Sequence, residues 1–147
     1  MKKPVIVLLC TIVFAGRAAA QEPAYLSAPD VRASLPFSEA VRVGNMLYLS
    51  GSIGVVPGTL KLAEGGIAAE TKQTLENIRT IVERHGSSMD RVVKCLVMMA
   101  DMSEWAKMNE TYITFFPKNK PARSAVGASG LALNARVEIE CVAVVGK

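Results

Sequence analysis

The sequence predicts an α+β domain in which a single mixed β-sheet carries two helices on one face. Three observations lead to this prediction. Two short β-prone runs open the domain, two amphipathic segments of helical length follow with a strand between them, and a pair of strands closes the chain. Elements in this order favour one sheet with the helices packed against it. The length of 147 residues suits one domain and leaves no room for a second.

The first twenty residues are distinct from that domain. Lys2 and Lys3 precede an apolar stretch, and alanines at 18–20 supply a small-residue cleavage site. This layout is typical of a secretory signal peptide, and about a dozen apolar residues are fewer than the roughly twenty that span a membrane. We therefore expect residues 1–20 to be a cleaved signal peptide and residues 21–147 to form the domain. The mature protein would be periplasmic or secreted, with no membrane association.

The basic balance of the chain comes largely from that segment. Lys2, Lys3 and Arg17 leave with it, so the 17 bases fall to 14 against 13 acids and the net charge falls from +4 to +1. A near-neutral domain with few aromatic residues has neither the charge nor the stacking surface that nucleic acids require. We expect no nucleic-acid partner.

The N-terminal third of the domain reads as a lead-in, a hairpin and a loop. Residues 21–35 are rich in Pro, Ala and Ser and are expected to be irregular. The runs 40–43 and 46–50 flank Gly44-Asn45, a two-residue turn that predicts a hairpin. The glycine-rich stretch 51–66 is expected to be a loop with a short strand at 60–62.

The first helix is expected over residues 67–85, because its apolar residues share one helical face: Leu75, Ile78, Ile81 and Val82. Gly86 stands where a glycine commonly ends a helix, so His85 is expected to occupy the last turn rather than to act in catalysis. Residues 91–99 read as a buried strand.

The second helix is expected over residues 103–116, with Ser103 as its N-cap and Pro117 after its end. Four large residues recur at helical spacing and are expected in the core: Trp105, Met108, Tyr112 and Phe116. Strands at 122–128 and 135–144 complete the chain.

Cys95 and Cys141 are the two cysteines of the mature domain, and both lie in strand-like runs. An oxidising compartment would allow a disulfide, but the apolar surroundings favour two buried free thiols. Their spacing matches no zinc pattern, and His85 is the one histidine in the chain, so no metal site is expected.

Charged residues in apolar strands are the candidates for chemistry. Arg123 lies within Pro-Ala-Arg-Ser-Ala-Val, and Glu138 and Glu140 alternate through the last strand, so that both point to the same face. A guanidinium can hold a carboxylate by two parallel hydrogen bonds, and a carboxylate can orient a water. From the residues alone, a surface ion pair and a ligand-binding cleft both remain open. Phosphate loops and dinucleotide fingerprints are absent.

From Leu35 to its C-terminus the sequence resembles the Rid/YjgF family. The matching motifs keep their order and spacing over a hundred residues: Pro36-Phe37-Ser38-Glu39-Ala40-Val41, Val43-Gly44-Asn45, Leu47-Tyr48-Leu49-Ser50-Gly51, Gln73-Thr74-Leu75-Glu76-Asn77-Ile78, Val92-Val93-Lys94, Met108-Asn109-Glu110-Thr111-Tyr112, Phe115-Phe116, Pro121-Ala122-Arg123-Ser124 and Val137-Glu138-Ile139-Glu140. The resemblance points to an exported member of this family.

The resemblance implies a chorismate mutase-like fold assembled as a homotrimer, with clefts between neighbouring subunits. It implies hydrolytic deamination of reactive 2-imino or 2-enamino acids to 2-oxo acids and ammonia, without a cofactor. Arg123 would clamp the carboxylate of the substrate, and Glu138 would orient the attacking water. The remaining pocket residues implied by the resemblance are Phe37, Ser50, Gly51, Asn109 and Ala125.

Several positions depart from the pattern of the family's deaminases. Phe37 stands where many members carry a tyrosine, Ser52 replaces a common glutamine, and Ala125 replaces a frequent cysteine. These departures suggest a shifted substrate preference. They also keep open an alternative function, a non-catalytic small-acid-binding or chaperone-like trimer of the same fold.

Overall fold

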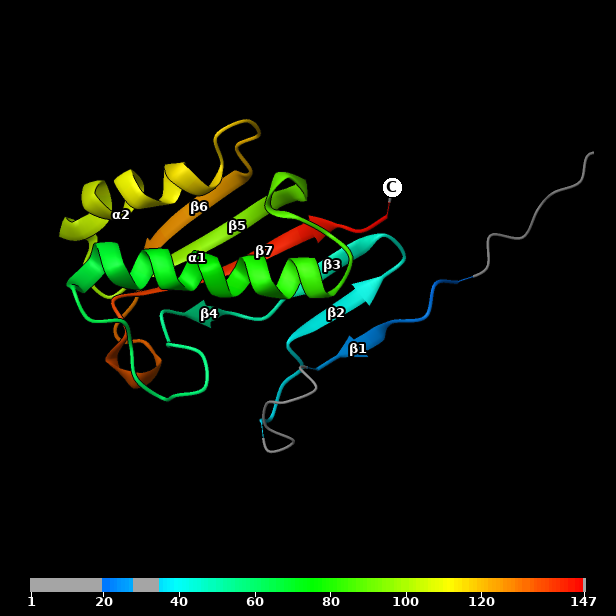
Figure 1. Cartoon of the computed structure of the whole chain (residues 1–147), viewed down its shortest axis with the longest axis horizontal. Helices are drawn as coiled ribbons and strands as arrows, with labels where there is room; N and C mark the ends of the chain where they lie inside the picture. The colour runs from blue at the N-terminus through cyan, green and yellow to red at the C-terminus, as the bar shows by residue number, and fades with distance from the viewer. Residues whose placement is uncertain (1–19, 28–34, 147) are drawn as a thin grey trace, which may run out of the picture.

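A computed structural model describes residues 20–27 and 35–146 of the chain; residues 1–19 of the expected signal peptide lie outside the described part. The described residues form one sheet and two α-helices (Figure 1). The strands are β1 (Ala24–Leu26), β2 (Ala40–Val43), β3 (Met46–Leu49), β4 (Ser52–Ile53), β5 (Val92–Met99), β6 (Ala122–Gly127) and β7 (Val137–Val144). The helices are α1 (Gly66–Arg84) and α2 (Trp105–Tyr112).

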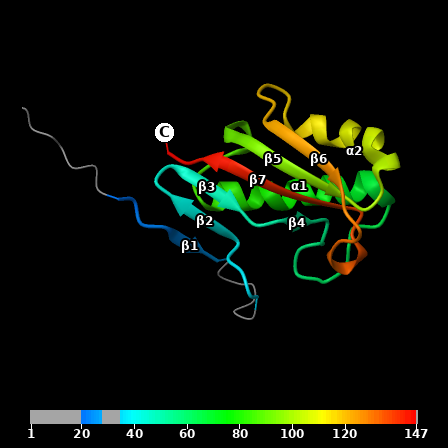
Figure 2. The same cartoon turned by 180° about the vertical axis from the view of Figure 1, so that it is seen from behind.

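The sheet is mixed, as predicted. Its strand order is β1-β2-β3-β7-β5-β6, and β4 also pairs with β7. The strand pairs are antiparallel except β5 and β6, which run parallel. Parallel neighbours need a crossover connection, and α2 supplies it between β5 and β6. The C-terminal strand β7 therefore lies in the middle of the sheet, beside β3, β4 and β5 (Figure 2).

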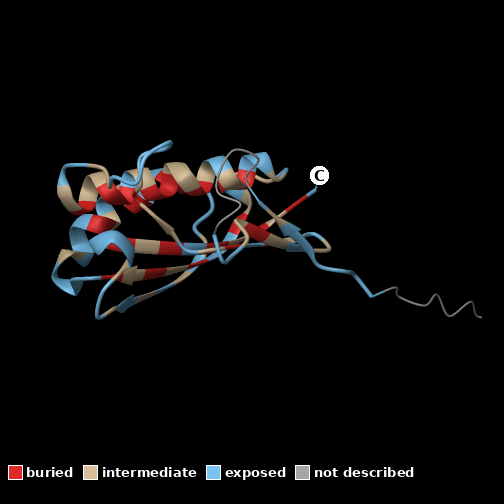
Figure 3. Cartoon of the chain, turned by 90° about the horizontal axis from the view of Figure 1, so that it is seen from below, coloured by how far each residue is buried: buried red, intermediate tan, exposed pale blue. Residues whose placement is uncertain are grey.

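Both helices cover the same face of the sheet, which confirms the predicted α+β architecture (Figure 3). The core lies between this face and the helices. It includes Leu75 and Ile78 from α1, Met108 from α2, and Val97 and Ile139 from the sheet, all with fully buried side chains. The opposite face of the sheet carries no layer of the described chain, and we call it the open face.

The N-terminal third matches the predicted hairpin but differs at two other places. The turn between β2 and β3 is formed by Gly44, at φ 59°, and Asn45. The lead-in is not wholly irregular, because residues 24–26 pair with β2 as strand β1. This short strand uses backbone hydrogen bonds along an edge, and its exposed side chains give no pattern to read. The strand expected at 60–62 is reduced to one bridge between Val55 and Leu62, while 52–53 form β4.

The first helix was predicted to within one residue at each end, and Gly86 follows it at φ 78°. The second is less regular than predicted. A 3₁₀ turn precedes α2 and another follows it. The N-cap of the first turn is Asp101, whose side chain accepts a hydrogen bond from the Ser103 N–H at 2.8 Å. Ser103 was therefore wrong as the predicted N-cap. Four residues of this segment were expected in the core, and the prediction was wrong for Trp105, which is 43% exposed.

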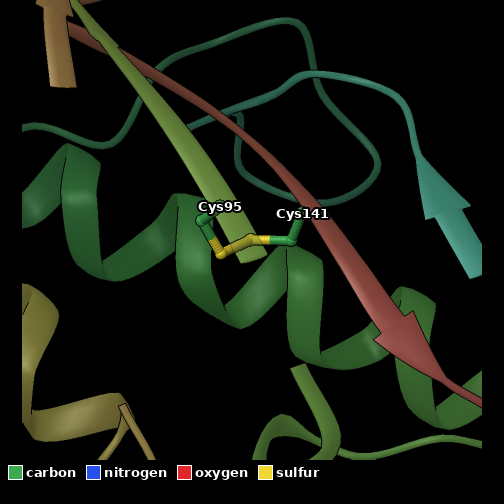
Figure 4. Close-up of a disulfide and its surroundings, with 2 residues drawn as sticks. All are labelled: Cys95 and Cys141. Carbon is green, nitrogen blue, oxygen red and sulfur yellow. A yellow bond between two sulfur atoms is a disulfide. The ribbon is translucent and has the colours of Figure 1, made fainter. Parts of the chain in front are cut away.

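The two cysteines form a disulfide, so the preference for free thiols was wrong (Figure 4). Cys95 on β5 and Cys141 on β7 are direct cross-strand partners, with Cα atoms 4.1 Å apart. The sequence placed both in buried strands but could not show that the strands are neighbours in this register. Among the described residues, no helix is both long and apolar enough to cross a membrane.

Candidate functional site

Arg123 lies on the helix-covered side of β6. It is the register partner of Cys95, and neighbouring residues in register share a face of the sheet. Cys95 is fully buried on the core side, so Arg123 points toward α2. Its guanidinium carbon lies 4.6 Å from the centre of the Tyr112 ring, in a cation–π contact. The described residues offer no carboxylate within ion-pair distance of Arg123.

A cavity of about 270 Å³ opens beside this guanidinium, and we call it the Arg123 cavity. The helical segment contributes Asn109, Tyr112, Ile113 and Phe116 to its lining. The chain leading into β6 contributes Lys120, Pro121 and Arg123. The lining is apolar apart from one amide, one phenol and two cations. A concave site of this kind, mostly apolar with a few polar groups, is typical of small-molecule binding.

Tyr112 forms the floor under Arg123. Its side chain is 7% exposed, and its hydroxyl finds no hydrogen-bond partner among the described residues. Burial raises the pKa of Tyr112 to about 12, and the positive charge of Arg123 opposes this rise. The phenol therefore stays neutral at physiological pH. The sequence pattern placed Tyr112 in the core but gave no sign that its ring supports the guanidinium.

Glu138 lies on the opposite side of the sheet. Val137 and Ile139 flank it with fully buried side chains, so the alternation of a strand turns Glu138 to the open face. Glu140 faces the same way, as predicted. The Glu138 carboxylate lies against Gly51, where an added Cβ atom would overlap it. A side chain at position 51 would therefore displace the Glu138 carboxylate.

Ser50 precedes Gly51, and two hydrogen bonds join it to the segment that follows Phe37. The Ser50 hydroxyl donates to the Ser38 carbonyl at 2.7 Å, and the Ser50 N–H donates to the Glu39 carbonyl at 3.0 Å. These bonds join the start of β2 to the end of β3 and bring Phe37 toward Ser50. Phe37 is 55% exposed and offers an unpartnered aromatic side chain at this rim.

The predicted site residues therefore form two groups within one chain. The first group contains Phe37, Ser50, Gly51 and Glu138. The second contains Asn109 and Arg123, with Ala125 two residues further along the same face of β6. The sheet separates Arg123 from Glu138, so these two side chains do not share a cleft in a single chain. The resemblance implied that these two residues meet in a cleft between neighbouring subunits, and that stays a prediction. Sequence reasoning missed Lys120, which the cavity lining adds.

A second hollow lies between the two helices. Its charged lining residues are Lys72, Glu76, Arg79 and Glu110, so the two signs are balanced. Arg79 is already paired with Glu76 at 2.8 Å and stacks over the Phe115 ring at 4.8 Å. This self-neutralised groove shows no preference for a ligand charge, unlike the Arg123 cavity.

Comparison with known proteins places the chain. Residues 27–145 match the family model described as "Endoribonuclease L-PSP". The RutC family protein PH0854 of Pyrococcus horikoshii is 43% identical over 108 residues, which cover 74% of this chain and 86% of that protein. The 2-iminobutanoate/2-iminopropanoate deaminase of Mus musculus is 40% identical over 111 residues, covering 76% of this chain and 82% of the relative.

The fold gives the same answer. The crystal structure of the YjgF gene product from E. coli superposes with a TM-score of 0.75 at 34% identity, covering 82% of this chain and 98% of that one. The family match, the relatives and this shared fold span nearly all of the described residues. The chain belongs to the Rid/YjgF (L-PSP) family.

Proposed function

We propose that this protein hydrolyses reactive 2-imino and 2-enamino acids to 2-oxo acids and ammonia. The observation that carries the proposal is the Arg123 cavity, in which a guanidinium without a carboxylate partner faces a small apolar space. Relatives about 40% identical are named 2-iminobutanoate/2-iminopropanoate deaminase, which supports the same reaction here.

Arg123 holds the substrate carboxylate in this mechanism. Its planar fork makes two parallel hydrogen bonds to the two oxygens, and the low polarity of the cavity strengthens them. The Tyr112 ring below restricts the orientation of the guanidinium. The bound acid is thereby fixed with its C=N carbon exposed to attack, and such positioning lowers the entropic part of the barrier.

Glu138 orients the water. Its carboxylate accepts a proton from the water as the oxygen adds to the C=N carbon of the protonated imine, and the nitrogen becomes an amine. The carboxyl returns this proton to the nitrogen, the C–N bond breaks as ammonia leaves, and the remaining hydroxyl gives its proton to the carboxylate as the carbonyl of the 2-oxo acid forms. One water is consumed and one ammonia is released, so no cofactor is required.

Arg123 and Glu138 can act together only if they come from different copies of the chain, and we propose a homotrimer with its sites between subunits. Two features support this assembly. The sheet separates the two side chains within one chain, and the open face carries large apolar residues: Tyr48, Leu96, Met98, Val126 and Val142. Glu138 and Glu140 share this face, and large uncovered apolar side chains gathered beside them are typical of an interface between subunits.

We also propose that the protein is exported. The disulfide between Cys95 and Cys141 supports this, because such bonds persist in oxidising compartments. Export is tested by expressing the chain in a Gram-negative host and measuring the mass of the protein recovered from the periplasm. Loss of residues 1–20 and two fewer thiol protons are expected, whereas an uncleaved chain recovered from the cytoplasm would contradict export.

An amino-acid oxidase that generates imines in place, with semicarbazide as the trap, tests the activity. The purified protein should suppress trapping. Arg123→Met should lower the rate about a hundredfold, and Arg123→Lys nearly as much, because a lysine lacks the fork. Lys118→Met, an exposed change outside the cavity, is the matched control. If the wild-type protein binds 2-oxo acids but leaves trapping unchanged, the non-catalytic binding function replaces this proposal.

A further inference from the structure

The Arg123 cavity holds a second cation that the proposed reaction does not use. Lys120 lines the same space as Arg123, three residues earlier in the chain. Neither residue has a carboxylate partner among the described residues. None of the lining residues is acidic, so the cavity gathers two positive charges that no carboxylate of its lining balances.

Charge complementarity determines which ligand suits such a cavity. A substrate with one carboxylate neutralises Arg123 and leaves the Lys120 ammonium without a partner on the ligand. A substrate with two carboxylates neutralises both cations, and like-charge crowding in the cavity is relieved. The groove between the helices, with balanced charges, offers no such preference.

The size and the walls of the cavity limit the ligand further. Its volume of about 270 Å³ lies just below the usual range of ligand pockets, which begins at about 300 Å³, so only a small ligand fits. Ile113, Phe116 and Pro121 supply an apolar wall of the same cavity. Three residues of extended chain span about 10 Å, so the long side chains of Lys120 and Arg123 can approach the two ends of a short acid. A methylene chain would lie against the wall.

We propose that Lys120 makes this site selective for dicarboxylic ligands, specifically 2-imino dicarboxylic acids of four or five carbons. The inference rests on the proposed function for the identity of the reacting group, but the recognition of two carboxylates is independent of turnover. Arg123 binds the carboxylate next to the C=N carbon, and the Lys120 ammonium binds the distal carboxylate. Lys120 is exposed, so its contribution is a preference of modest size that added salt weakens.

Calorimetric titration with stable acids tests the recognition step. Succinate and butyrate are compared, then glutarate and pentanoate, at low and high salt. The wild-type protein should bind each diacid about fivefold more tightly than its monoacid partner at low salt. Lys120→Met should abolish this difference, Lys120→Arg should keep it, and Lys118→Met should leave it unchanged. High salt should reduce it.

Two results would overturn the inference. One is a wild-type protein that binds monoacids and diacids equally. The other is a Lys120→Met variant that weakens both by the same factor, which is the result expected if Lys120 pairs with Glu138 of another copy. The imines made from aspartate and alanine then give the catalytic comparison, in which Lys120→Met should lower kcat/KM for the first alone. A diacid preference without turnover of either imine would reject the deaminase function and keep the assigned ligand class.

Discussion

At the scale of single residues, Gly51 is a position where the backbone lies close to a proposed catalytic group, the Glu138 carboxylate. An added Cβ atom would overlap the Glu138 carboxylate and push it out of place. We predict that Gly51→Ala lowers kcat about tenfold or more while KM for the imine changes little, because Arg123 holds the carboxylate elsewhere. Steady-state kinetics test this. An unchanged kcat in a folded Gly51→Ala protein would show that Glu138 does not need its present position.

Tyr112 gives a second prediction at this scale, which concerns how the stability of the fold depends on pH. Burial raises its pKa from the ordinary 10 to about 12 in the folded protein, so the folded state holds the phenolic proton more tightly than the unfolded state. The part of the unfolding free energy that this proton contributes is fully present below pH 10, and it is lost as the pH rises through 12.

Tyr112→Phe should remove this loss, and it should be at least as stable as the wild type at pH 7, because it deletes a buried hydroxyl without a partner. Urea unfolding of both proteins from pH 7 to 12, at one protein concentration, measures the difference. The two curves should diverge by about 1–2 kcal/mol above pH 10. Parallel curves would contradict the prediction.

At the scale of elements, Glu70 joins α1 to the start of β7. It is a buried carboxylate, 6% exposed, that accepts from the Arg136 N–H at 2.8 Å. Glu70→Ala leaves that N–H unpaired and should cost about 1–3 kcal/mol of unfolding free energy. Glu70→Gln keeps an acceptor oxygen and should cost less. Denaturant unfolding compares the two variants, and equal losses would show that charge, not the hydrogen bond, matters.

The disulfide is the second element-scale feature, because it joins the neighbouring strands β5 and β7 on the core side of the sheet. It closes a loop with a sequence separation of 46 residues. Removing it frees the unfolded chain and should cost about 2–4 kcal/mol. A Cys95→Ala/Cys141→Ala double variant should show this loss in urea unfolding and should no longer respond to a reductant. Equal stability of the double variant and the oxidised wild type would mean that β5 and β7 need no cross-link.

At the scale of the whole molecule, the separation of Arg123 from Glu138 gives the strongest test of assembly. Arg123→Ala and Glu138→Ala should each be inactive. Refolding the two together should restore activity, because a site between subunits can combine an intact arginine from one chain with an intact glutamate from the next. Random mixing in a ring predicts about one quarter of the wild-type sites.

Sedimentation of the mixture should give a single trimer. No recovery of activity from a well-mixed trimer would mean that the two residues act in the same chain after a rearrangement, or not together. Each inactive variant refolded alone is the control, since it must stay inactive.

Much of this protein could be predicted from its sequence, because the determining signals are local. The Gly44-Asn45 turn fixed the hairpin, a helical apolar stripe ending at Gly86 fixed α1, and alternation in the last strand put Glu138 and Glu140 on one face. The motif around Arg123 identified the candidate binding residue. Each of these depends on backbone preference or periodicity within a few residues.

The tertiary structure decided what depends on register and on faces. Pairing of Cys95 with Cys141 requires β5 and β7 to be neighbours at one particular register, which chain-distant residues do not reveal. Strand order puts the sheet between Arg123 and Glu138 within one chain, which their positions in the sequence do not show. The packing of the second helical segment beside β6 decided that Lys120 lines the Arg123 cavity. Sequence spacing determines which face of an element a side chain occupies, whereas only packing of distant elements determines which faces meet.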